Sequence, residues 1–113
     1  MEKDDLIFID HIFESIIKIE RYVDGLTVHD FVDNDLVKDA VVRNFEIIGE
    51  ATKHLSPEFR NKYPEIPWKK IGGMRDILIH DYLGIDIYAV WDTIASDLPD
   101  LKHKLLVILQ KPN

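Results

Sequence analysis

The sequence predicts an all-α fold, an antiparallel bundle of four principal helices with short accessory helices. Apolar residues recur at intervals of three and four in separate long stretches, which is the spacing of one helix face. Capping residues, glycines and prolines separate these stretches. No stretch alternates apolar and polar residues as a strand would. The chain has 113 residues, 46% of them hydrophobic, and fits one domain over 1–113 that buries roughly two-thirds of its unfolded surface.

The first helix is predicted over 4–23, and Gly25 just beyond it is a typical left-handed helix stop. Thr27 and Asp30 have the spacing of a capping pair, which predicts a short helix through Phe31 and Val32. The apolar stripe of the first helix consists of Leu6, Ile9, Ile12, Phe13, Ile16, Ile19 and Val23.

The second long helix is predicted over 35–55, with two stripes. The apolar stripe contains Asn44, a single amide that would fix the register of the helix. The charged stripe has two interpretations: a solvated face held by pairs of opposite charge, or a row in which Arg43 or Glu50 lines a cleft. The buried side is predicted to be Val37, Ala40, Val41, Asn44, Ile48, Ala51 and Leu55, and the charged stripe Asp39, Arg43, Glu46, Glu50 and Lys53.

Two proline-containing caps follow this helix. Ser56 before Pro57 predicts a short helical turn that ends at Tyr63, and Pro67 before Trp68 repeats the device. Residues 63–68 therefore form an ordered connector.

The next helix is predicted to begin at Gly72 and Gly73 and to end near Gly84. The glycine pair indicates a backbone that is either flexible or closely approached by a neighbour. Asp86 would cap a further helix, and Pro99 marks a break or a new first turn before the last helix. The apolar positions of these last two helices are Ile87, Val90, Trp91, Ile94, Leu101, Leu105, Ile108 and Leu109.

Charge and composition exclude several classes of protein. A net charge of −7 and a pI near 5.1 argue against a broad electrostatic grip on nucleic acid, so any RNA contact would be local. Cysteine is absent, which excludes disulfides and thiolate metal sites. The sequence contains no apolar run long enough for a membrane span and opens too acidic for a signal peptide, so we expect a cytoplasmic protein. The histidines are not spaced as metal ligands, and neither a metal nor a cofactor is predicted.

The chemistry is expected in the run RDILIHDY, residues 75–82. Arg75 offers a planar, permanently charged fork for a phosphate, and His80 can exchange protons near neutrality. Together they are suited to cleaving RNA without a metal: His80 takes a proton from the 2′-hydroxyl, and Arg75 stabilises the charge that builds on phosphorus. DNA lacks that hydroxyl, so the substrate would be RNA and the first product a cyclic phosphate.

Helix geometry complicates a site within one helix. Residues five apart lie roughly 140° around a regular helix, so Arg75 and His80 would face different ways, whereas Arg75 and Tyr82 nearly share a face. Either the helix loosens near His80, or two subunits combine their groups across a two-fold axis. The second arrangement is the one we favour.

Each of these residues also has a purely structural interpretation. Arg75 would be an exposed cation, His80 a histidine with its hydrogen bonds satisfied, and Tyr82 a core or interface aromatic. Asp76, four residues before His80, would be a surface acid in contact with it.

The run from Arg75 to Tyr82 resembles the Arg-x4-His-x-Tyr signature of HepT-like toxins of the HEPN superfamily, in which a polar residue such as Asp76 follows the arginine. Residues 44–51 (NFEIIGEA), 63–68 (YPEIPW) and 71–75 (IGGMR) resemble that family's other segments in the same order.

The resemblance implies a homodimeric helical bundle that acts as a metal-independent endoribonuclease, the toxin of a toxin-antitoxin pair. Its partner would be a minimal nucleotidyltransferase antitoxin, with which it would form a dimer or a larger assembly. Arg75 and His80 would hold the catalytic positions, and Tyr82 would receive adenylyl groups from ATP. The alternative is a non-catalytic HEPN adaptor subunit of a nucleotidyltransferase complex.

Overall fold

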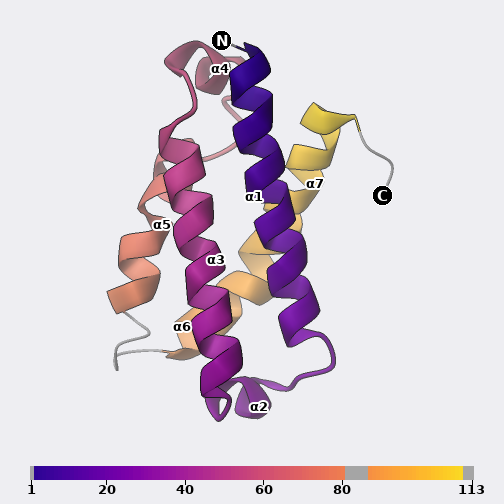
Figure 1. Ribbon diagram of the computed structural model, residues 1–113, viewed down its shortest axis with the longest axis vertical. Coiled ribbons are helices and arrows are strands. Elements are labelled where there is room, and N and C mark those ends of the chain that lie inside the picture. The colour runs from indigo at the N-terminus through magenta and orange to yellow at the C-terminus, as the bar shows by residue number, and fades with distance from the viewer. Residues whose placement is uncertain (1, 81–86, 111–113) are drawn as a thin grey trace.

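The computed structural model describes residues 2–80 and 87–110, and within them it contains helices and no strand. Four long helices and three short ones follow one another (Figure 1), together with a π-helical segment, η2. The predicted all-α bundle of four principal helices is therefore confirmed. No helix in the described part of the chain is long and apolar enough to span a membrane. The bounds are α1 Glu2–Val23, α2 Val28–Val32, α3 Asp35–Lys53, α4 Pro57–Lys62, α5 Trp68–His80, α6 Ile87–Asp92, η2 Thr93–Asp97 and α7 Leu98–Leu109.

The long helices alternate in direction (Figure 1). Helix α3 packs against α1 on one side and α5 on the other, and α7 packs against α1. The core between them is built from the apolar stripes that the sequence predicts for α1 and α3, which include the fully buried Ile9, Ile16 and Ile48. Phe45, which the predicted stripe of α3 omitted, is also buried, whereas Leu6, which the predicted stripe of α1 included, is 38% exposed.

Local capping explains where the first helices end and begin. Gly25 adopts φ +77, the left-handed conformation expected of a helix stop. The Thr27 N–H donates to Asp30 Oδ2 at 3.0 Å, and the Asp30 N–H donates to Thr27 Oγ1 at 3.2 Å, which is the predicted capping box. The bond from the Thr27 backbone, followed by the one with its side chain, lowers the pKa of Asp30 below its ordinary value.

A buried carboxylate joins the start of α1 to the turn before α4. Asp5 is only 3% exposed and accepts two hydrogen bonds of 2.8 Å, from the N–H and from the Oγ of Ser56. Ser56 also caps α4, because its Oγ accepts from the Phe59 N–H at 3.2 Å. The predicted cap is confirmed, and its tie to Asp5 fixes the end of the bundle where α4 and α5 meet.

Replacing Asp5 by Ala is expected to lower the free energy of unfolding by about 2 kcal/mol, because the Ser56 N–H and hydroxyl lose a charged acceptor in a buried place. Urea unfolding followed by circular dichroism measures the change. Asp24→Asn removes a carboxylate from an exposed position and should change stability by less than about 0.5 kcal/mol. Equal losses in the two variants would show that Asp5 acts only through net charge.

The prediction that the fifth helix begins at the glycine pair is wrong, since α5 begins at Trp68 and continues through Gly72 and Gly73. The connector supplies the reason: the Trp68 indole N–H donates to the carbonyl oxygens of Arg60 (3.1 Å) and Tyr63 (3.0 Å), which anchors the first turn. Gly72 is buried, and a Cβ there would lie 3.8 Å from side-chain atoms of α3. A methyl group at Gly72 would thus make ordinary van der Waals contact, so helix packing does not require a glycine there.

The C-terminal helices form an almost continuous rod. Helix α6 continues directly into η2. Pro99 lies in the first turn of α7, so of the two predicted roles, a break or a new first turn, it has the second. The predicted roles of Gly84 and Asp86 fall outside the described residues.

Candidate active site

Helix α5 carries the Arg-x4-His part of the motif. Ile71 and Met74 are 3% and 7% exposed and hold one side of α5 in the core, and Gly72 is buried beside α3. Asp76 is exposed, so the helix presents a carboxylate to solvent two residues after Met74. Tyr82 lies outside the described residues.

The geometry of α5 bears on how Arg75 and His80 meet. The helix remains α-helical from Trp68 through His80, without the loosening that would bring them together before the histidine. Their backbone positions are therefore about 140° apart around the axis and about 7.5 Å apart along it. Within the described residues, α5 therefore does not bring these two backbone positions onto one face.

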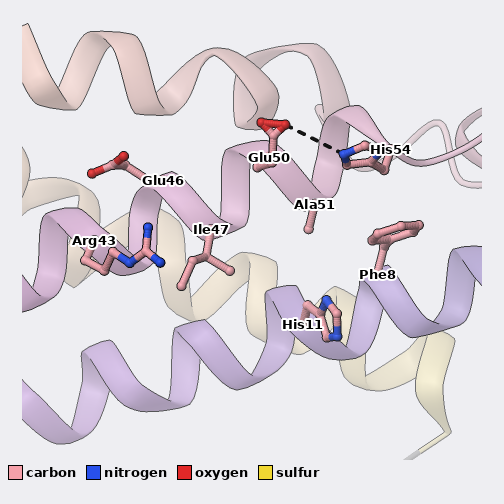
Figure 2. Close-up of a pocket in the computed structure, with 8 residues that line it drawn as sticks. All are labelled: Phe8, His11, Arg43, Glu46, Ile47, Glu50, Ala51 and His54. Carbon is pink, nitrogen blue, oxygen red and sulfur yellow. Dashed lines mark ion pairs between the residues drawn. The ribbon is translucent and has the colours of Figure 1, made fainter.

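A pocket of about 570 Å³ lies on the face formed by α1 and α3 (Figure 2). Arg43 and Glu50 both line it and both are exposed, so the charged stripe of α3 is a solvated face that also lines a cleft. Helix α1 contributes His11 and the ring of Phe8 to the same pocket, which was not predicted. The lining residues are Phe8, His11, Arg43, Glu46, Ile47, Glu50, Ala51 and His54.

Contacts inside this α1/α3 pocket centre on Phe8. Its ring stacks on His54 with centroids 5.1 Å apart and meets His11 edge-on at 6.1 Å. His54 Nε2 lies 3.7 Å from Glu50 Oε2, and both side chains are more than half exposed. Such an exposed pair contributes little to stability.

The charge of the α1/α3 pocket does not suit a phosphate. Arg43 is its one permanent cation, against the carboxylates of Glu46 and Glu50. Within the described ranges, no three histidine, aspartate or glutamate side chains are grouped so that they could hold a metal ion.

Asn44, the predicted register-fixing amide, is buried and turns back on its own helix. Its Nδ2 donates to the Ala40 carbonyl oxygen at 2.9 Å. Its Oδ1 is buried without a hydrogen-bond partner in the part of the chain that the structure describes. Only the Nδ2 side of the amide is therefore bonded, and that bond lies within α3 rather than between two helices.

Comparison with known proteins places this arrangement in context. Residues 12–108 match the family described as "Ribonuclease HepT-like". A protein of Methanocaldococcus jannaschii, named as a gamma-glutamylcyclotransferase and proposed RNase, is 47% identical over 98% of this chain; the chain spans only half of that relative's length. A proposed RNase of Caldanaerobacter subterraneus is 42% identical, covering 92% of this chain and 93% of the relative. A protein of Thermococcus cleftensis, named as a proposed ribonuclease HepT, is 40% identical, covering 86% and 88%. No solved structure matches the chain.

Proposed function

Because the chain belongs to the HepT-like ribonuclease family of the HEPN superfamily, we propose that it is a metal-independent endoribonuclease whose catalytic residues are Arg75 and His80. The family match confirms the resemblance that the sequence predicted, and the matched residues 12–108 include all of α5. The observation that carries the proposal is the placement of an arginine and a histidine five residues apart on one helix, α5, which Ile71 and Met74 anchor in the core.

In the proposed reaction, His80 accepts the proton of a ribose 2′-hydroxyl, and that oxygen attacks the adjacent phosphorus. The bond from phosphorus to the 5′ oxygen breaks, and this oxygen takes up a proton as it leaves. Arg75 donates hydrogen bonds to the phosphate oxygens while negative charge develops on them. The products are a 2′,3′-cyclic phosphate and a 5′-hydroxyl.

The site would be completed in a homodimer. Arg75 and His80 diverge around a regular α5, so a two-fold axis is the simplest way to direct one group from each subunit at the same phosphate. Asp76 follows Arg75 on the exposed surface and would support the site from there.

Incubating the purified protein with RNA and a metal chelator tests the proposal. Cleavage is expected to continue in the chelator and to yield cyclic phosphate ends, which mass spectrometry of the fragments identifies. Cleavage that stops with the chelator and returns with a divalent cation would overturn the metal-independent mechanism.

The chain is further proposed to be the toxin of a pair whose antitoxin is a minimal nucleotidyltransferase acting in the same cytoplasm. The phenol oxygen of Tyr82 would attack the α-phosphorus of ATP, and pyrophosphate would leave. The added phosphate charge and purine, two residues beyond His80, would repel and obstruct RNA.

Co-expression with an active nucleotidyltransferase is expected to raise the intact mass of this protein by whole AMP units. Tyr82→Phe should abolish the gain because it removes the accepting oxygen, whereas Tyr88→Phe, at an exposed tyrosine on α6, should leave it unchanged. Intact-mass spectrometry measures both. An unshifted mass in the wild-type protein would leave binding alone as the means of inhibition.

A second candidate function is a non-catalytic adaptor that docks on a nucleotidyltransferase. The net charge of −7 and the acidic balance of the α1/α3 pocket favour it, because both suit a basic protein surface. Under this function, expression alone is harmless to growth and His80→Ala changes nothing.

A further inference from the structure

A second groove, of about 760 Å³, lies where α4, the connector and the first turn of α5 meet. Arg60, Lys69 and Lys70 line it together with Trp68, three prolines and two other uncharged residues. It contains three cations and no carboxylate, in a chain whose net charge is −7. We call it the basic groove. Its charge is opposite to that of the α1/α3 pocket.

The cations of the basic groove are available to a ligand. Arg60, Lys69 and Lys70 form no ion pair within the described residues, whereas Lys38, Lys102 and Lys104 each have a carboxylate partner. Arg60 Nε is buried and, among the described residues, has no hydrogen-bond partner. A guanidinium that has lost water at one nitrogen without gaining a partner interacts strongly with an anion.

The backbone around the basic groove is already ordered before a ligand binds. The indole N–H of Trp68 donates to the carbonyl oxygens of Arg60 and Tyr63, which ties α4 to the start of α5. Prolines in the lining restrict the backbone further. An anion would therefore bind without a large ordering cost.

Lys69 and Lys70 are also unfavourably placed for the stability of α5. Both lie in its first turn, which contains no acidic residue, so two positive charges face the positive end of the helix dipole. Local features that oppose stability are often retained because they serve binding.

The basic groove lies on the same helix as the motif. Lys70 precedes Arg75 by five residues and His80 by ten, which along α5 corresponds to about 7.5 Å and about 15 Å. From these observations we propose that the basic groove binds the phosphodiester backbone of the RNA substrate at a site separate from the reacting phosphate. RNA as the ligand rests on the proposed ribonuclease function; the anion site itself rests on the groove.

The groove would recognise the backbone and not the bases. Trp68 is 7% exposed and its indole nitrogen is already engaged, so it offers no ring for stacking. Binding should thus be independent of base sequence and sensitive to salt. Substrates too short to reach from the reacting phosphate to the groove gain nothing from it.

The test compares K69E/K70E with K18E/R21E, which makes the same change in charge at exposed positions on α1. Affinity is measured with a long 2′-O-methyl RNA, which lacks the attacking hydroxyl, so binding is read without cleavage. K69E/K70E is expected to weaken binding roughly tenfold or more and to reduce the salt slope by ~1.4, at ~0.7 for each lost phosphate contact on a single strand. K18E/R21E should change the affinity far less. The melting temperature of K69E/K70E should be equal to or above that of the wild type, because glutamates suit a first helical turn.

Cleavage provides a second measurement. K69E/K70E should raise KM for the long RNA and leave cleavage of a dinucleotide unchanged, since a dinucleotide cannot reach the groove. Equal losses of affinity in the two charge-reversal variants would overturn the proposal, and so would an unchanged affinity in K69E/K70E. Tighter binding of a polyglutamate peptide than of RNA would also overturn it, because the groove would then bind an acidic protein segment. If no RNA is cleaved but binding still depends on Lys69 and Lys70, the proposed reaction fails and the groove stands.

Discussion

His80→Ala is expected to reduce the rate of RNA cleavage by roughly 10²- to 10⁴-fold, the usual contribution of a positioned general base. No other group in the proposed reaction can take the proton of the 2′-hydroxyl, so the attacking oxygen stays a poor nucleophile. Arg75→Lys keeps the positive charge and loses the planar pair of donors. Its rate of RNA cleavage should therefore fall less than that of His80→Ala. Single-turnover cleavage of a defined RNA separates these losses from changes in binding.

His103→Ala is the matched control for the loss at His80. His103 is exposed on α7 and has no part in the motif, so this variant should cleave at the wild-type rate. Circular dichroism and melting temperature establish that both histidine variants are folded. Undiminished cleavage by folded His80→Ala would remove His80 from the mechanism.

Most of the fold could be predicted because local signals and burial agree. The three- and four-residue spacing in α1 and α3 coincides with the faces that the structure buries, and Gly25 and Ser56 act as caps where their residue types predict. The start of α5 was mispredicted because the glycine pair is a local signal for a break, whereas Trp68 anchors the helix one turn earlier through bonds to carbonyl oxygens five and eight residues before it. Those bonds depend on how the connector folds back, which the spacing of residues does not show.

The candidate site also has a part that could be predicted from the sequence and a part that depends on the fold. Arg75 and His80 are found from spacing alone because the motif is contiguous. The basic groove was missed because Arg60 is separated in sequence from Lys69 and Lys70, and only the fold of the connector brings the three to one place. A usable signal was present, since Lys69 and Lys70 stand together, directly after Trp68, in an acidic chain. The α1/α3 pocket also depends on the packing of two helices, and the sequence indicated only its α3 side.

Mixing two inactive variants should restore cleavage if each site combines groups from two subunits. In a dimer of one Arg75→Ala subunit and one His80→Ala subunit, one site lacks both groups, and the other pairs the intact arginine of one chain with the intact histidine of its partner. Each mixed dimer then has one working site of two. Random reassortment makes half of all dimers mixed, so about a quarter of the wild-type activity should return.

The regularity of α5 is what makes this restoration a sharp measurement. A site built within one subunit needs both groups from one helix, and the helix that runs unbroken to His80 places their backbone positions about 140° apart. Under that arrangement, each mixed dimer contains only defective sites and activity stays at the level of the single variants. Refolding the two variants together, with each refolded alone as the control, and following single-turnover cleavage distinguishes a return to about a quarter from no return.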